Sequence, residues 1–306
     1  MKNSVKIMLG FLFLGVLFNC KQSDSSDKET ILKGSTTILV DETLKPIIQA
    51  QIDIFQSEYK AKIILTSKSE NEIEKAFLAD SSRIVVLARK LNENETKYFQ
   101  NLKITPKTTK IGTDAIAFIS NKASKDTLIA LEDVIEFMRG KTKSSIKGLV
   151  FDNLNSSTVR YMNDLAGLKT VPAKGIYSFK TNEEVIKYVS ENDGMIGVVG
   201  LNWLYEPTSN VKEYLKKVNV LSVKGISKTG YFAPTQNNLA EGTYPLARDL
   251  YIINCQGYSG LGMGFASFVA GDIGQRIILK SGLLPWRTPG RKVIIKTKSN
   301  NENENE

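Results

Sequence analysis

The sequence predicts an α/β protein of two lobes, and three observations lead to this fold class. Short apolar runs alternate with amphipathic helical patterns along most of the chain, which is typical of βα units and of a largely parallel sheet. The chain has 306 residues, of which 42% are hydrophobic and 24% are charged, so it is long enough for two hydrophobic cores. Polar residues follow the ends of several predicted strands, where α/β sheets bind their ligands.

Residues 1–19 have the layout of a secretory signal. Lys2 and Lys6 accompany the apolar stretch 7–18, which is shorter than the roughly 20 residues that a membrane-spanning helix needs. The ending Leu17-Phe18-Asn19-Cys20 resembles a bacterial lipobox, in which Cys20 becomes the lipid-modified first residue of the mature protein. Asn19 replaces the usual small residue, as in the relaxed lipoboxes of Bacteroidota. The alternative is a plain signal peptide followed by an incidental cysteine.

Polar segments border the predicted fold at both ends. Residues 20–33 are expected to form a flexible tether, and the low-complexity residues 296–306 a disordered tail. Cys20 and Cys255 are the only cysteines in the sequence, so a lipid on Cys20 leaves no disulfide. Cys255 is then expected to be a small buried hydrophobic residue.

The first half of the chain contains three predicted strands that end in polar residues. Strands are expected at 37–40, 62–65 and 84–88, and the first is followed by a helix with Pro46 in its first turn. Helix N-termini at this edge of a sheet attract anions. Each of Asp41, Thr43, Ser67 and Ser69 could be a simple helix cap, but the set together favours a binding site. Arg89 follows the third strand.

The second half places hydroxyl groups at the start of a helix. Strands are expected at 115–119 and 149–151, with an acidic helix at 131–138 between them. Ser156, Ser157 and Thr158 then precede a helix whose first turn contains Arg160. A cation in that position opposes the helix dipole and requires an anionic partner. The partner is either a ligand or a neighbouring carboxylate, for which Asp152 and Asp164 are the candidates.

Composition argues against several other functions. The chain has no histidine, which excludes Ser-His-Asp and Cys-His catalysis and removes the commonest zinc ligand, so neither an enzyme nor a metal or cofactor site is expected. The net charge is +9, but lysines are interspersed with acidic residues, so nucleic-acid binding is not expected.

The glycines at 260, 262 and 264 follow no nucleotide-binding spacing and predict close backbone packing. Trp203 and Trp286 are expected to pack in the interior, and the basic segment 291–296 to form a charged edge strand.

Five segments together resemble the phosphate-binding periplasmic proteins of phosphate ABC transporters. The segments are Val40–Pro46 with the following QAQIDIF, DNLNSSTVRYM, Gly194–Gly200, Tyr244–Arg248 and FASFVAGDIGQRIILKSGLLP. The resemblance implies a type II periplasmic-binding-protein fold, in which each lobe is a central sheet flanked by helices and the chain crosses twice at a hinge. It places lobe 1 at residues 34–112 with 241–295 and lobe 2 at residues 113–240.

The resemblance also implies a ligand site. Its matching positions are Thr43, Leu44, Ser69, Ser156, Ser157 and Thr158. Two positions depart from the family pattern, because Arg89 stands where an acidic residue is usual and Asp152 where an arginine is usual. The charges could have been exchanged between the lobes, with Arg89 and Arg160 as the cations of the site. Alternatively, the acidic residues indicate a ligand other than phosphate.

The expected protein is a monomeric lipoprotein of the cell envelope that faces the periplasm. It would capture phosphate or a related oxyanion and present it to an inner-membrane permease. The alternative is an accessory or structural lipoprotein of a TonB-type import complex that keeps the fold but not phosphate binding. An enzyme on the same fold is a more distant possibility.

Overall fold

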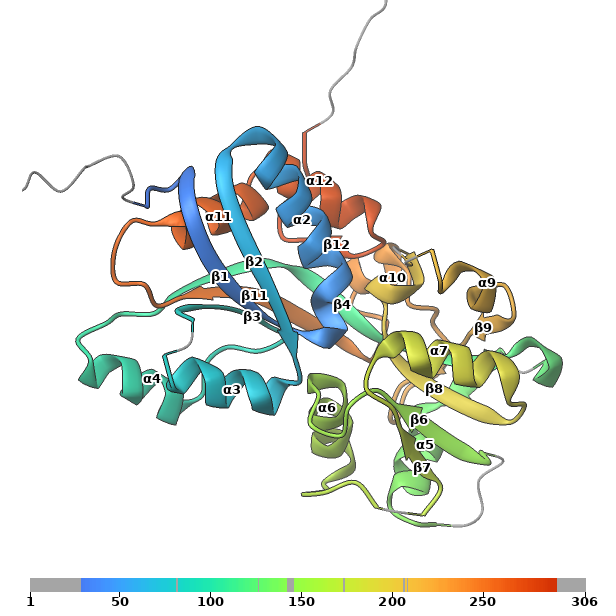
Figure 1. Cartoon of the computed structure of the whole chain (residues 1–306). Coiled ribbons are helices and arrows are strands. Elements are labelled where there is room, and N and C mark those ends of the chain that lie inside the picture. Colours follow the sequence, from blue (N-terminus) through green and yellow to red (C-terminus); the bar gives the residue numbers. More distant parts are fainter. Residues whose placement is uncertain are drawn as a thin grey trace, which may run out of the picture.

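The computed structural model describes residues 29–80, 82–125, 127–141, 146–172, 174–205, 207 and 209–290. The predicted signal peptide, Cys20, the basic segment 291–296 and the predicted tail lie outside the described residues. The α/β prediction is confirmed: a curled mixed sheet, flanked by helices, extends through two lobes (Figure 1). No helix of the described part is long and apolar enough to cross a membrane.

The sheet of the first lobe contains three parallel strands and one antiparallel strand, joined to the long strand β4. Their order is β2-β1-β3-β11-β4, and β11 runs antiparallel to both of its neighbours. The strands are β1 (Lys33–Asp41), β2 (Lys60–Lys68), β3 (Ile84–Leu87), β11 (Ala247–Asn254) and β4 (Lys107–Asn121). A largely parallel sheet was the wrong expectation, because buried strands are equally apolar whichever way they run.

Alternating residues of β1 and β3 separate two layers of helices. Ile38 and Val40 point into the main core, whereas Leu39 points into a smaller cluster on the opposite face. Helices α2, α11 and α12 cover the first face, and α3 and α4 cover the second (Figure 1). These helices are α2 (Lys45–Glu58), α3 (Glu70–Leu78), α4 (Glu93–Asn101), α11 (Leu261–Ala270) and α12 (Asp272–Lys280).

The second lobe continues the sheet beyond β4. Strand β8 (Met195–Gly200) pairs antiparallel with β4, followed by β6 (Gly148–Phe151) and β7 (Ile176–Ser178) in parallel. Helices α5 (Leu131–Met138) and α6 (Ser157–Ala166) pack on one face, and α7 (Asn182–Glu191) packs on the other. The shorter elements are η3 (Glu42–Leu44), η4 (Lys122–Ser124), β5 (Leu128–Ala130), α8 (Asn202–Tyr205), α9 (Lys212–Leu215), β9 (Val218–Val220), β10 (Ser222–Lys224), α10 (Gln236–Ala240) and β12 (Leu284–Pro285).

Strand β4 belongs to both lobes. Its first part pairs with β11 through Ala115, and its second part pairs with β8 from Ile116 onward. The strand therefore passes without interruption across the predicted boundary between residues 112 and 113, whose position remains a prediction. The chain returns to the first lobe through the buried residues Tyr244 and Leu246, which lead into β11.

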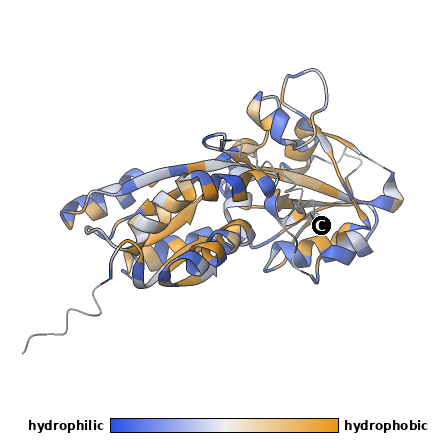
Figure 2. Cartoon of the chain, turned by 90° about the horizontal axis from the view of Figure 1, so that it is seen from above, coloured by the Kyte–Doolittle hydropathy of each residue, from blue (hydrophilic) through white to orange (hydrophobic). Residues whose placement is uncertain are grey.

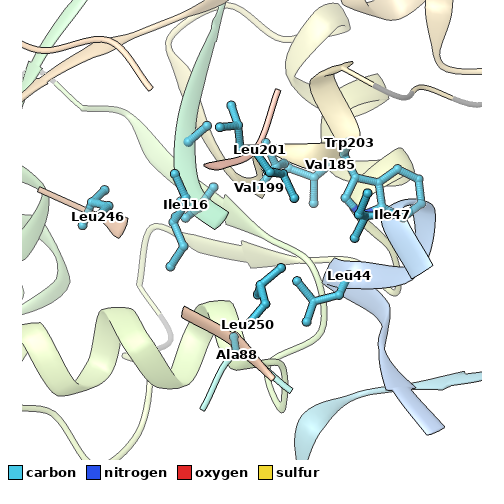
Figure 3. Close-up of a cluster of buried hydrophobic side chains, with 14 of the residues drawn as sticks. Leu44, Ile47, Ala88, Ile116, Val185, Val199, Leu201, Trp203, Leu246 and Leu250 are labelled. Atoms are coloured by element: carbon cyan, nitrogen blue, oxygen red, sulfur yellow. The ribbon is translucent and has the colours of Figure 1, made fainter. Parts of the chain in front are cut away.

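One hydrophobic cluster contains buried residues of both lobes. Figure 3 shows Leu44 of η3 and Ile47 of α2 with side chains from the region of β8 and α8. Those labelled are Val199, Leu201 and Trp203, together with Val185 of α7. Hydrophobic residues lie on the inner faces of the helices and strands of both lobes (Figure 2). The lobes therefore share apolar contacts close to the place where they meet.

Three packing predictions can be compared with the structure. A Cβ atom on Gly264 would lie 1.7 Å from the carbonyl oxygen of Ile31, so the predicted close backbone packing is confirmed. Cys255 is buried and free, as predicted. Trp203 is buried, but the prediction for Trp286 was wrong. Trp286 is 55% exposed because it follows α12 on the surface, where the Lys110 ammonium lies 4.8 Å from its ring centre.

Candidate functional site

The candidate site lies where the turn after β1 meets the first turns of α6 and α7. We call it the interlobe site; it comprises Asp41, Glu42, Thr43, Asp114, Asp152, Ser156, Ser157, Thr158, Asn182 and Arg248, all of which are buried. Asp41, Glu42 and Thr43 come from the first lobe, and the hydroxyl cluster comes from the second. In Figure 1 the helices α6 and α7 lie at the end of the first lobe where β1 and β2 terminate.

Local sequence determines both sides of this site. Pro46 in the first turn of α2 leaves no amide donor there, and the chain turns through η3 before the helix begins. Ser156 is the N-cap of α6, where its hydroxyl accepts a hydrogen bond from the Val159 amide at 3.3 Å. Thr181 caps α7 in the same way, through the Glu184 amide. Two capped helices therefore begin beside the turn after β1.

The carboxylate of Asp41 accepts hydrogen bonds from both lobes. One oxygen accepts the amide of Thr43 at 3.1 Å, and the other accepts the amide of Ser157 at 3.2 Å. Ser157 is the first residue of α6, so this carboxyl group occupies the positive end of the helix. The sequence pattern predicted Asp41 either as a helix cap or as one of a set of site residues, but its contact with a residue 116 positions away could not be read from local sequence.

Glu42 makes the equivalent contact with α7. Asn182, the first residue of that helix, donates its side-chain amide to Glu42 at 2.7 Å and its backbone amide at 3.4 Å. The same side-chain amide donates to Asp152 at 3.1 Å. Two adjacent carboxyl groups of the first lobe are thus bound at the N-termini of two helices of the second lobe.

Hydroxyl groups from the two lobes meet at Asp152. Thr43 Oγ1 donates to Asp152 at 3.1 Å, and Ser156 Oγ donates to the other carboxyl oxygen at 2.6 Å. Thr43 Oγ1 also lies 3.4 Å from Thr158 Oγ1. The structure therefore brings together Thr43, Ser156 and Thr158, which were predicted as site residues from opposite halves of the chain.

Arg248 supplies a buried positive charge beside these carboxyl groups. Its guanidinium donates to Ser157 Oγ at 2.9 Å and to Asp114 at 2.9 Å and 3.2 Å. Within the described ranges, four carboxyl groups of the interlobe site accompany this one guanidinium. Arg248 was quoted as part of a family motif but not predicted as a site residue. The sequence feature that could have identified Arg248 is its charge at the start of a largely apolar strand pattern.

The excess of buried carboxyl groups raises their pKa values. Burial raises the pKa of Glu42 to about 8, and the nearby charge of Asp152 adds to this effect. Burial likewise raises the pKa of Asp152 to about 7. The pKa values of Asp41 and Asp114 are also above their ordinary range, chiefly because of burial. At neutral pH the site therefore holds protonated carboxyl groups, which can donate as well as accept hydrogen bonds.

A family model described as "PBP superfamily domain" matches residues 25–272. The chain belongs to the periplasmic-binding-protein (PBP) superfamily. No curated protein matches it in sequence. The match covers the interlobe site and both strands, β4 and β11, that connect the lobes.

Solved structures of similar fold include phosphate-binding proteins of ABC transporters. A putative phosphate ABC transporter substrate-binding protein with bound phosphate from Clostridium perfringens is 18% identical, with a TM-score of 0.67 over 83% of this chain and 100% of that chain. A phosphate transport receptor from Vibrio cholerae is 17% identical, with a TM-score of 0.61 over 81% and 99%. PstS from Borrelia burgdorferi is 21% identical, with a TM-score of 0.52 over 83% and 99%. These similarities confirm the type II fold of this PBP-superfamily chain.

The remaining predicted site residues lie outside the interlobe site. Arg89 donates to Glu70 at 2.8 Å and to Glu95 at 2.7 Å and 2.9 Å. Arg160 donates to Glu70 at 2.6 Å and to Asp164 at 3.2 Å. We call Glu70, Arg89, Glu95 and Arg160 the Glu70 cluster. Both arginines are thus paired with carboxylates, and the principal partner of Arg160 is Glu70 rather than Asp152 or Asp164.

Two further predicted residues have structural contacts. Ser69 precedes α3, and its amide and hydroxyl both donate to Glu72, at 3.0 Å and 2.6 Å, which is a capping-box arrangement. The Leu44 side chain is fully buried in the shared hydrophobic cluster. Neither side chain contacts the residues of the interlobe site through a hydrogen bond among the contacts that the structure describes.

Open grooves flank the interlobe site on two sides. A groove of about 470 Å³ is lined by Glu42 and Ser156 together with Lys45, Lys68 and Lys180. A groove of about 790 Å³ reaches Arg248 from the other side and is also lined by Arg89, Lys90 and Arg160. Acidic residues line the same grooves, namely Glu72 and Glu183 in the first and Asp164 and Asp249 in the second. The interlobe site itself is filled by the protein's own side chains.

Proposed function

We propose that this chain is an envelope solute-binding protein that captures phosphate or a related oxyanion between its lobes and presents it to a membrane transporter. Lipid on Cys20 would anchor it on the periplasmic side. The observation that carries the proposal is the pair of helix N-termini, α6 and α7, directed at the turn after β1. Backbone amides at helix N-termini bind anions through hydrogen bonds and the helix dipole. Solved relatives of this fold include proteins described as phosphate receptors.

The donors in the interlobe site suit an oxyanion. The amides of Thr43 and Ser157 and the two donors of Asn182 already bind carboxylate oxygens of Asp41 and Glu42. A phosphate oxygen has the same hydrogen-bonding requirements as a carboxylate oxygen. The hydroxyls of Ser156, Ser157 and Thr158 add donors at the same helix end. In the groove that reaches Arg248, cations outnumber the carboxylates of Asp164 and Asp249, which would attract an anion toward the site.

The raised carboxyl pKa values favour binding at lower pH. Glu42, with a pKa of about 8, and Asp152, with a pKa of about 7, repel an anion when they are ionised and can donate hydrogen bonds to it when they are protonated. Affinity for sulfate, whose own charge is constant, should therefore rise as the pH falls from about 8 to about 6.

Calorimetry and thermal unfolding with phosphate, sulfate and a neutral sugar test the proposal. At a ligand concentration one hundred times the Kd, binding stabilises the fold by about 2.7 kcal/mol. Thr158→Val removes a hydroxyl of the interlobe site and should weaken oxyanion binding at least about tenfold, or about 1.4 kcal/mol. Thr127→Val is the matched control, since its side chain is exposed and lies outside the interlobe site, and it should leave the affinity unchanged. An unchanged melting temperature with every oxyanion would contradict the proposal.

A specific observation favours a second function, that of an accessory lipoprotein in a TonB-type import complex. The carboxyl groups of Asp41 and Glu42 occupy the helix N-termini, and Asp152 replaces the arginine usual in the family. A site filled in this way can serve as a fixed contact between lobes. Purification of the native protein from envelopes distinguishes the two functions. A permease and its ATPase would accompany a solute receptor, whereas TonB-type components would accompany an accessory protein.

A further inference from the structure

The turn of Asp41 and Glu42, which we call the acidic turn, places two carboxyl groups where an oxyanion solute would bind. The Asp41 carboxylate lies 3.2 Å from the Ser157 amide of α6, and the Glu42 carboxylate lies 2.7 Å from the Asn182 side chain that begins α7. Asp41 is fully buried and Glu42 is 8% exposed, so water does not compete strongly for these donors.

Both contacts cross between lobes. The acidic turn follows β1 of the first lobe, while α6 and α7 belong to the second. Other buried hydrogen bonds also join the lobes: Asn202 and Trp203 both donate to the carbonyl oxygen of Thr43, and Arg248 donates to Ser157 Oγ. Nearer the surface, Arg160 donates to Glu70, and Asn71 pairs with Asn155. The acidic turn therefore supplies part of the buried polar contact that joins the lobes, beside Thr43, Asp152 and Arg248.

We infer that the acidic turn is an internal ligand of the interlobe site, which holds the lobes closed without solute and which an oxyanion must displace. This inference rests on the proposed function for the identity of the competing solute. The contact that closes the lobes stands on the hydrogen bonds alone. In this arrangement Asp41 and Glu42 set the affinity threshold of the site, because a solute must bind the helix N-termini more strongly than the protein's own carboxyl groups do.

Removal of the acidic turn has a direct consequence for the closed state. In Asp41→Ala/Glu42→Ala the backbone amides of Thr43, Ser157 and Asn182 lose their side-chain acceptors, and the Asn182 side chain keeps only its bond to Asp152. Each buried donor without an acceptor costs about 1–3 kcal/mol. The ligand-free variant should therefore open so that water reaches these donors, and an oxyanion should bind them without first displacing a carboxyl group.

The experiment compares this variant with Asp53→Ala/Glu58→Ala, which makes the same two types of substitution on the exposed surface of α2. Small-angle scattering without ligand reports lobe opening, and calorimetry with inorganic phosphate reports affinity. We expect a larger radius of gyration and a gain in phosphate affinity of at least about tenfold in the acidic-turn variant only. Asp41→Asn/Glu42→Gln keeps the side-chain volumes and one acceptor oxygen on each residue, which binds an N–H donor more weakly than a carboxylate does. It should shift both readouts in the same direction by a smaller amount, and it serves if the alanine variant fails to fold.

The possible outcomes separate the inference from the proposed function. An unchanged radius of gyration in both acidic-turn variants would show that the acidic turn does not hold the lobes closed. Opening with unchanged or weaker phosphate binding would overturn the competition, while measurable binding by the unaltered protein would leave the proposed function intact. Opening without phosphate binding in any variant would overturn the proposed function and the competition together, and would leave the acidic turn as a structural contact between lobes.

Discussion

The interlobe site and the Glu70 cluster each contain a buried glutamate, and the pKa values of these two residues, Glu42 and Glu70, shift in opposite directions. In the Glu70 cluster, Arg89 donates hydrogen bonds to Glu70 and Glu95, and Arg160 donates to Glu70. Burial alone would raise the pKa of Glu70, but hydrogen bonds and charges from Arg160 and Arg89 outweigh it and hold the pKa below its ordinary value. In the interlobe site several carboxyl groups accompany Arg248 alone, and burial raises the pKa of Glu42 to about 8. The number of nearby cations therefore decides which buried carboxyl groups stay ionised.

Removal of Arg248 should have the largest effect on this contrast. Arg248→Met takes away the buried cation that serves Asp114 and Ser157. Breaking a buried ion pair costs about 3–5 kcal/mol of unfolding free energy, because the remaining charge has no partner. Urea denaturation at neutral pH measures this loss. Arg276→Met, which breaks a partly exposed pair with Asp272, should cost less than about 1 kcal/mol. Equal losses in the two variants would contradict the contrast.

Matched substitutions of Glu70 and Glu42 should have a smaller and unequal effect. Glu70→Gln removes the charge that binds Arg89 and Arg160, which should lower the unfolding free energy by about 2 kcal/mol. Glu42 is mostly protonated at neutral pH, so Glu42→Gln changes little charge and should cost less than about 1 kcal/mol. Urea denaturation of both variants gives the comparison. A greater loss for Glu42→Gln would mean that its carboxyl group is ionised.

The pH dependence of stability should follow the interlobe site. Glu42 and Asp152 have pKa values of about 8 and about 7, above those of the unfolded chain, so the folded state binds more protons near neutral pH. Their stabilisation is complete below the unfolded pKa values and is lost as the pH rises through the folded ones. Unfolding free energy should therefore fall by at least about 1 kcal/mol between about pH 6 and about pH 8.

Glu70 should not contribute in that range, since its folded pKa is lowered and its stabilisation is lost only in acid. In Glu42→Gln/Asp152→Asn the pH profile should become flat between about pH 6 and about pH 8. A profile that is already flat in the unaltered protein would show that the carboxyl groups of the interlobe site are ionised throughout this range.

Thr43→Val should give the smallest effect. The substitution keeps the shape of the side chain but removes the hydroxyl that donates to Asp152. One buried hydrogen bond contributes about 1 kcal/mol, which thermal unfolding can resolve. Thr127→Val at an exposed position is the control and should leave the melting temperature unchanged. A loss well above about 2 kcal/mol would indicate that the Thr43 hydroxyl supports the whole interlobe network.

Local features of the fold could be predicted from sequence, whereas pairings could not. The helix at 131–138 and the strand ends before Asp41 and Arg89 follow from short patterns. The first part of β4, Lys107–Lys110, is polar, so the sequence pattern did not predict a strand there. This part of the strand pairs with β11. The antiparallel direction of β11 could not be predicted either, because apolar alternation is the same in parallel and antiparallel strands.

The candidate site divides in the same way. Hydroxyls at a helix start are a local signal, and the structure places Ser156, Ser157 and Thr158 at the N-terminus of α6 beside Thr43. The partners of Arg89 and Arg160 are not local, since Glu70 lies 19 and 90 residues away. Charge alone therefore suggested ligand-binding arginines, while the fold pairs them with a carboxylate of the protein.

The sharing of β4 by both lobes has a consequence for how the protein denatures. Residues up to Ala115 pair with β11, and residues from Ile116 pair with β8, so each lobe contains part of one continuous strand. If either lobe unfolded, the other would lose the support of β4, which lies between β11 and β8 in the sheet that both lobes share. Heat or urea should therefore melt the two halves in a single transition, and a polypeptide cut within β4 should yield fragments that regain structure only when mixed.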